Sequence, residues 1–214
     1  MAPKSPQRQS ETDAADVRRA VLDATLAIAS TTGPDAVSMR EVARAAGVSH
    51  QAPYHYFGDR AGIFAAIAAE GFEALAGEFR QVLSTSAHPS RDTFEAYVRL
   101  ARTHPGHFRI MFRADLCGVL THESTREAAD GGFQELLNMV QRTVGEHLSE
   151  RDLFTWSSLM WSTAHGFATL LVDGPLITKL PEGTNVEQHI DDVISLMTEM
   201  VESTASRLGL TGAR

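Results

Sequence analysis

The sequence predicts an all-α protein, and two observations carry this prediction. Apolar residues recur three and four positions apart over long stretches, as they do on one face of an amphipathic helix. Glycine and proline interrupt the chain between these stretches, and no segment shows the sustained alternation of a half-buried strand. Hydrophobic residues make up 43% of the 214 positions, which is enough for a packed core and excludes wholesale disorder.

The N-terminal part is expected to form three helices and the start of a fourth. After a polar, flexible arm at residues 1–12, an apolar face continues until Gly33-Pro34 ends the first helix. The pattern S-x-x-E at residues 38–41 is a capping box that opens a short helix, which Gly47 closes. A second short helix follows from Ser49 to about Phe57. Asp59 then caps a long helix that reaches about Ser84.

The C-terminal part is expected to be a helical bundle. Its helices are predicted at about residues 90–104, 105–114, 124–148, 150–172 and 186–208. Ser149 and Asn185 are expected N-caps, and a Gly- and Pro-rich linker at 173–184 separates the last two helices. We therefore predict an arm at 1–12, a helix-turn-helix domain at 13–60 and a ligand-binding and dimerisation domain at 61–214, connected through the helix at 59–84.

Charge and composition restrict the function classes. The net charge is −8, yet residues 1–60 carry equal numbers of basic and acidic side chains, so all of the excess acid lies beyond them. Such asymmetry is compatible with a DNA-reading end and a self-associating body. The single Cys117 excludes an internal disulfide and fits a reducing compartment. No apolar run approaches a membrane span and no signal peptide is evident, so we expect a cytoplasmic protein without a membrane partner.

Residues 39–46 and 50–57 have the pattern of a helix-turn-helix. Ala43 is small where the two helices would cross, and Gly47 can adopt the left-handed conformation that ends the first helix. Ser49 is expected to cap the second helix, whose first turn would reach base edges in the major groove of DNA. Because helical hairpins with Ala and Gly at this spacing are common, the pattern alone leaves DNA binding and a purely structural hairpin open.

The surrounding sequence narrows this choice. Residues 38–64, SMREVARAAGVSHQAPYHYFGDRAGIF, resemble the DNA-binding domain of the tetracycline-repressor (TetR) family. The shared marks are V-A-x-x-A-G-V-S at 42–49, Y-H-x-F at 54–57 and the capped long helix after them. The resemblance implies a one-component transcriptional regulator, usually a repressor, that binds double-stranded operator DNA as a homodimer.

The resemblance also implies which side chains contact DNA. His50 and Gln51 are expected to read base edges, since Gln can bind adenine bidentately and His can donate to guanine. The residues expected to hold phosphates are Ser38, Arg40, Ser49, Tyr54, His55 and Arg60. The alternatives are that His50 and Gln51 are merely exposed and that Tyr54 belongs to the core. Pro53 and Gly62 depart from the family pattern; we expect Pro53 to shape the first helical turn and Gly62 to loosen the start of the long helix.

The apolar residues after position 90 are rich in aromatics and methionine, which suits an adaptable cavity for an unidentified, largely apolar effector as well as an ordinary core. Trp161 to Gly166 matches the W-x-x-x-H-G signature of the WHG type of TetR C-terminal domain, which the chain resembles over about residues 90–172. The candidate effector-binding residues are Phe108, Met111, Phe112, Phe133, Leu137, Met160, Trp161 and His165. His165 could instead satisfy a buried carbonyl of the protein.

Apolar stripes on the last two helices are the predicted dimer interface, where two copies would form a symmetric four-helix bundle. The candidate residues are Leu153, Trp156, Ala168, Ile190, Ile194, Met197 and Val201. The same stripes are also compatible with packing inside one chain.

Neither a cofactor nor a metal is expected. His104 and His107 have the spacing of metal ligands, but no carboxylate or thiol at helical spacing completes a set. Cys117 is interpreted as a packed thiol. No catalytic motif is evident, so an enzyme built on a helical bundle is a remote alternative to a repressor that an effector releases from DNA. The sequence is also compatible with a ligand-independent or activating DNA-binding regulator and, more remotely, with a protein–protein adaptor.

Overall fold

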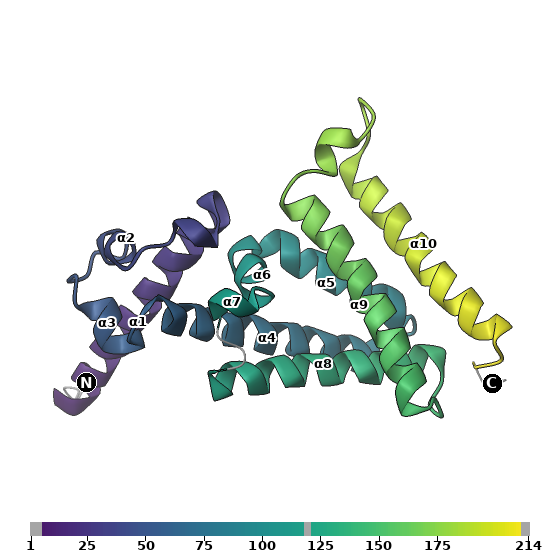
Figure 1. Cartoon of the computed structure of the whole chain (residues 1–214), viewed down its shortest axis with the longest axis horizontal. Helices are drawn as coiled ribbons and strands as arrows, with labels where there is room; N and C mark the ends of the chain where they lie inside the picture. The colour runs from purple at the N-terminus through teal and green to yellow at the C-terminus, as the bar shows by residue number, and fades with distance from the viewer. Residues whose placement is uncertain (1–5, 118–120, 211–214) are drawn as a thin grey trace, which may run out of the picture. The chain divides into compact units, whose positions relative to one another are not determined.

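The computed structural model describes residues 6–117 and 121–210, and over these residues the chain is helical without a strand (Figure 1). The α-helices are α1 (Pro6–Thr32), α2 (Met39–Ala45), α3 (Ala52–Phe57), α4 (Arg60–Thr85), α5 (Pro89–Thr103), α6 (Pro105–Met111), α7 (Ala114–Cys117), α8 (Glu123–Val144), α9 (Glu150–Val172) and α10 (Val186–Arg207). Two short 3-10 turns, η1 (Pro34–Ala36) and η2 (Ile177–Lys179), lie between them. The all-α prediction is confirmed. None of the described helices is both long and apolar enough to cross a lipid bilayer.

The described helices form two compact units. The first unit comprises residues up to 72 together with 104–128, and the second comprises 73–103 together with 129 onward. The long helix α4 and the helix α8 each contribute one end to each unit. The first unit includes residues 104–128 because α6 packs against α1, and α7 against α6; the domain boundary at residue 60 stays a prediction.

In the first unit, α1 packs against α2, α3 and α6. Val21, Val42, Ile63 and Ile67 are fully buried and form the centre of its core. The approach of α6 to α1 is close, since a Cβ on Gly106 would lie 2.8 Å from the carbonyl oxygen of Leu26. This proximity explains why α6 belongs to the first unit.

Arg109 of α6 also holds the C-terminal end of α1. Its guanidinium donates to the carbonyl oxygens of Ser30 at 2.6 Å and of Ala29 at 3.3 Å. The last carbonyls of a helix have no partner within the helix and carry a partial negative charge, so a cation there stabilises the end.

In the second unit, α5 packs against both α9 and α10. Figure 1 shows α9 (green) and α10 (yellow) running in opposite directions on either side of the linker that contains η2. Both predicted N-caps are confirmed: Ser149 Oγ accepts from the backbone N–H of Asp152 at 3.1 Å, and Asn185 Oδ1 accepts from that of Gln188 at 3.2 Å.

Most predicted helices are present, with differences at their ends. Residues 6–12 continue α1 where we expected an arm; Pro6 suits a first helical turn, and no Gly or Pro follows it before Thr12. Residues 1–5 of the predicted arm lie outside the described residues. The helix predicted at 105–114 ends at Met111 as α6, and α7 follows as a separate short helix. The helix α8 ends at Val144, before Gly145.

Candidate nucleic-acid interface

The helix α2 is closed at both ends by local hydrogen bonds. Ser38 Oγ accepts from the backbone N–H of Glu41 at 3.2 Å, as the capping box predicts. At the other end Gly47 has φ +67°, Val48 N–H donates to Ala43 at 3.1 Å and Gly47 N–H donates to Arg44 at 3.3 Å. These two bonds form a Schellman motif, so the predicted end of the helix at Gly47 is confirmed.

The start of α3 differs from the prediction. Gln51 occupies the N-cap position without a side-chain cap, and Ser49 does not cap the helix. Instead, the carbonyl of Ser49 accepts from the N–H of Ala52 at 3.0 Å and forms a turn. Pro53 explains the shift: it has no N–H and cannot donate to the carbonyl four residues earlier. It lies in the first turn of α3, as expected, and His50 and Gln51 lie in the turn that precedes the helix.

The junction between α3 and α4 is tight at Gly62. Asp59 caps α4 by accepting from Gly62 N–H at 2.9 Å. A Cβ on Gly62 would lie only 2.0 Å from the carbonyl oxygen of Phe57, the last residue of α3. Glycine is thus the residue that allows this close approach of two backbones, and its expected loosening of the helix start stays a prediction.

The predicted DNA-contacting side chains lie at the surface of the first unit, with one exception. Seven are exposed: Ser38, Arg40, Ser49, His50, Gln51, Tyr54 and His55. Tyr54 is 42% exposed, so it is not a core residue, and its ring lies 5.8 Å from that of His50. The turn that precedes α3 and the side of α3 that carries Tyr54 and His55 are therefore accessible to solvent.

Two shallow grooves collect most of these side chains. The first groove is lined by Ser38, Arg40, Glu41, Ala43, Arg44, Val48 and His50. The second is lined by Val17, Gly47, Val48, Ser49, Gln51, Ala52, His55 and Tyr56. Val48 lines both, so the grooves adjoin at the turn between α2 and α3. Arg44 is not among the residues predicted to contact DNA, although its position four residues after Arg40 places both on one side of α2.

Arg60 is the exception. It is half-buried; its Nη1 donates to the carbonyl oxygen of Val37 at 3.2 Å, and its guanidinium lies 5.4 Å from the centre of the Phe64 ring. Val37 directly precedes the N-cap of α2. Arg60 therefore joins the start of α4 to the segment that leads into α2.

The candidate effector-binding residues are divided between the two units. Phe108, Met111 and Phe112 belong to the first unit, where the Phe112 ring lies 5.5 Å from those of Phe72 and Phe108. The others, Phe133, Leu137, Met160, Trp161 and His165, belong to the second. There the Phe133 ring lies 6.1 Å from both Trp161 and Phe154, and Trp161 and Phe154 are 40% and 61% exposed. These three rings form an aromatic cluster on α8 and α9.

Trp161 and His165 converge on the hydroxyl of Tyr97. Tyr97 Oη lies 2.8 Å from His165 Nδ1, and the side chain of Trp161 also hydrogen-bonds Tyr97. Because burial raises the pKa of Tyr97 and lowers the pKa of His165, both side chains are neutral near pH 7. The indole N–H can only donate, so the Tyr97 hydroxyl accepts from Trp161, and the same hydroxyl shares a second hydrogen bond with His165 Nδ1. His165 thus bonds the buried hydroxyl of Tyr97, and its contact with an effector stays a prediction.

The apolar stripes on α9 and α10 pack mainly within the second unit. Six of the seven candidate interface residues are buried there: Trp156, Ala168, Ile190, Ile194, Met197 and Val201; Leu153 is half-buried. The single chain thus uses these residues for its own core, a possibility that the sequence leaves open. Other large apolar side chains on the same helices are exposed: Phe154, Leu159, Trp161 and Leu170 on α9, and Leu196 and Met200 on α10.

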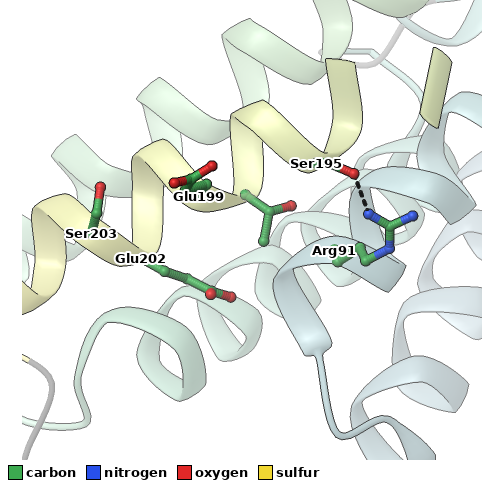
Figure 2. A pocket seen from close by; sticks show the side chains of 6 residues that line it. Arg91, Ser195, Glu199, Glu202 and Ser203 are labelled. Carbon is green, nitrogen blue, oxygen red and sulfur yellow. Dashed lines mark hydrogen bonds between the residues drawn. The ribbon is translucent and has the colours of Figure 1, made fainter. Parts of the chain in front are cut away.

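A polar hollow between α5 and α10 was not expected from the sequence (Figure 2). It is lined by Arg91, Ser195, Thr198, Glu199, Glu202 and Ser203. Arg91 donates to Ser195 Oγ at 2.6 Å and pairs with Asp191, and the buried Ser90 hydroxyl donates to Glu202 at 2.7 Å. These groups bond one another across the two helices, so the hollow is part of a polar contact between α5 and α10.

The sequence also singles out Cys117 and the pair His104 and His107. Cys117 is buried, with Sγ 3.6 Å from the carbonyl oxygen of Met111, which fits a packed thiol. The rings of His104 and His107 lie 5.9 Å apart, and His107 Nε2 lies 3.8 Å from Glu70. Burial lowers the pKa of His107, although Glu70 opposes the shift. Within residues 6–117 and 121–210, no three His, Cys, Asp or Glu residues are placed to hold a metal ion.

Solved structures with this fold are numerous, and three illustrate the similarity. A protein of unknown function from Rhodococcus sp. RHA1 is 23% identical, with 88% of this chain and 94% of that chain covered and a TM-score of 0.68. A TetR-family transcription regulator from Marinobacter aquaeolei VT8 is 21% identical (91% and 98% covered, TM-score 0.65). The TetR-family regulator PfmR from Thermus thermophilus is 19% identical (84% and 97% covered, TM-score 0.63). No curated protein matches the sequence.

Family models match both parts of the chain. The model of bacterial regulatory proteins of the tetR family matches residues 21–67, which include α2, α3 and every residue that lines the two grooves except Val17. The model of the tetracyclin repressor-like C-terminal domain matches residues 91–197, which include the W-x-x-x-H-G segment; its assignment to the WHG type stays a prediction. The two matches cover an N-terminal and a C-terminal domain of one family. The chain therefore belongs to the TetR family of DNA-binding transcriptional regulators.

Proposed function

We propose that this regulator is a repressor that binds operator DNA as a homodimer and is released by a small, largely apolar effector. The observation that supports it most directly is the exposure of His50, Gln51 and Tyr54 in one unit, together with uncovered apolar side chains on α9 and α10 in the other. Reading of bases is assigned to His50 and Gln51, and phosphate contacts to Ser38, Arg40, Ser49, Tyr54 and His55.

The homodimer is proposed through the exposed apolar face of α9 and α10 rather than through the buried stripes. Leu159 and Leu170 are 53% and 46% exposed on α9, and Leu196 and Met200 are 60% and 69% exposed on α10. Gly166 lies between the two leucines of α9 with open space beside it, so another helix can approach closely. A second copy is the proposed occupant because TetR regulators function as dimers and one recognition helix reads too few bases.

The dimer is tested with Met200→Glu and Leu159→Glu. Each change places a charge in the proposed interface, so sedimentation should show a monomer whose affinity for DNA is strongly reduced. Ile177→Glu is the matched control, because Ile177 is another exposed apolar residue (40%) but lies in η2, outside α9 and α10. Variants that remain dimers, or a control that dissociates equally, would contradict the proposed interface.

The effector is proposed to bind the second unit near Phe133, Leu137, Met160 and Trp161. The support is the aromatic cluster on α8 and α9, in which Phe154 and Trp161 are exposed and offer apolar surface. Met160, which precedes Trp161 in the sequence, is fully buried. An effector can weaken DNA binding only by its difference in affinity for two conformations, typically about 1–3 kcal/mol of coupling.

This coupling is reciprocal, and it can be measured from either side. Compounds from a panel of apolar small molecules that raise the melting temperature would be titrated with and without saturating DNA. A repressor of the proposed kind binds such a compound about 5- to 150-fold more weakly when DNA is bound. Equal affinity in both titrations would contradict release by that compound, and tighter binding would indicate a co-repressor or an activator.

A further inference from the structure

Arginine side chains around the helix-turn-helix differ in what holds them. Arg18 donates to the carbonyl oxygen of Tyr56 at 3.0 Å and lies 4.6 Å from the centre of the Phe57 ring. Arg60 is held in the same way by Val37 and Phe64. Both guanidiniums are thus engaged by a backbone carbonyl and an aromatic face.

Arg19 is held by carboxylates. It lies 2.8 Å from Asp23 and 3.0 Å from Glu70, so its charge is neutralised within the first unit. A phosphate would have to compete with these partners for it. Arg18, Arg19 and Arg60 are therefore used to join helices of the first unit to one another.

Arg44 differs from these three. Its side chain is 78% exposed. Its Nη2 lies 3.9 Å from Oε1 of Glu41, a long distance for an ion pair, and the Glu41 side chain is itself 47% exposed. Exposed pairs of this kind contribute little, typically below about 1 kcal/mol, so a phosphate can replace the carboxylate readily. Arg44 lines the first groove together with Ser38, Arg40 and His50.

We propose that Arg44 binds a DNA phosphate in the first groove, beside Arg40, and that Arg60 is a positioning residue rather than a phosphate ligand. The proposal rests on DNA binding by this unit. Arg40 and Arg44 are one helical turn apart on α2 and line the same groove as His50 of the turn. In an acidic chain, this pair concentrates positive charge next to the proposed base-reading residues.

The test measures the salt dependence of DNA binding by the full chain. The probe is a random-sequence duplex of about 30 base pairs, because phosphate contacts do not need an operator. The logarithm of the association constant falls linearly with the logarithm of the salt concentration, by about 0.9 per phosphate neutralised. Arg44→Ala should reduce this slope by about 0.9 for each Arg44 in the complex and weaken binding about tenfold or more at about 0.1 M salt. Arg44→Lys should restore the slope, since lysine supplies the same point charge.

Arg126→Ala is the matched control. Arg126 also belongs to the first unit, is 54% exposed and forms an i,i+3 pair with Glu123 at 3.8 Å. The variant removes the same charge from a similar pair away from the groove, and its slope should equal that of the wild type. Arg60→Ala should lower the melting temperature without reducing the slope.

The outcomes separate this assignment from DNA binding itself. An Arg44→Ala slope equal to that of the wild type or of Arg126→Ala would overturn the assignment of Arg44. An Arg60→Ala variant of unchanged melting temperature and reduced slope would overturn the positioning role of Arg60. A wild-type protein that fails to bind the duplex even at about 0.05 M salt would contradict DNA binding by this unit, and the proposal with it.

Discussion

The hydroxyl of Tyr97 lies 2.8 Å from Nδ1 of His165, and this hydrogen bond joins α5 to α9 inside the second unit. Trp161, one turn before His165, donates to the same hydroxyl. The W-x-x-x-H spacing therefore places two hydrogen-bonding side chains on one side of α9, where a single tyrosine of α5 bonds both.

Tyr97→Phe should destabilise the protein by about 0.5–1.5 kcal/mol, because it removes the buried hydroxyl that bonds the half-buried His165 and the more exposed Trp161. Urea denaturation of the wild type, Tyr97→Phe, His165→Gln and the double variant gives the coupling energy between the two side chains. We expect a coupling of about 0.5–3 kcal/mol. Additive effects of the two substitutions would show that the hydrogen bond contributes nothing to stability.

Stability should fall as the solution becomes mildly acidic. Burial lowers the pKa of His165 in the folded state, whereas an unfolded histidine titrates near about 6.5. Below about pH 6.5 the unfolded chain takes up a proton that the folded chain resists, so the free energy of unfolding decreases towards the folded pKa. Above about pH 6.5 this contribution is fully present.

Urea unfolding of the wild type and His165→Gln between about pH 7.5 and 5.5 tests this dependence. The variant should lose less stability than the wild type over this range. It should keep some dependence, because burial also lowers the pKa of His107. Parallel curves for the two proteins would show that His165 is not the responsible group.

Two glycines of α4 should respond in opposite directions to alanine. Gly62→Ala would place a Cβ 2.0 Å from the Phe57 carbonyl oxygen, so the junction between α3 and α4 must shift and DNA binding should weaken. Gly77 has open space beside it, and Gly77→Ala should stabilise the helix by about 0.5–1 kcal/mol. Thermal unfolding and binding to a duplex check both, and equal effects of the two substitutions would contradict the close contact at Gly62.

Helix ends that are determined by neighbouring residues could be predicted from the sequence. Ser38, Asp59, Ser149 and Asn185 cap the helices expected of them, since capping depends on residues within three positions. Ser49 was the exception, because Pro53 removes the hydrogen bond that an earlier start of α3 would need.

Features that depend on contacts between distant segments could not be predicted. The role of Arg60 depends on Val37, which lies 23 positions earlier, and the need for glycine at 62 depends on the backbone of Phe57. The stripe at Ile190 and Ile194 is apolar whether it packs within one chain or between two copies, so periodicity alone cannot separate these cases.

The central claim is that the turn before α3 and α3 itself read DNA sequence. Its most direct test is selection of bound fragments from sheared genomic DNA by the wild type and by a Gln51→Ala/Tyr54→Ala double variant, after unfolding curves have shown that both fold. We predict that the wild type retains fragments that share a two-fold symmetric sequence and that the variant retains none of them. A wild type that enriches no shared sequence, or a variant that enriches the same fragments, would contradict the account.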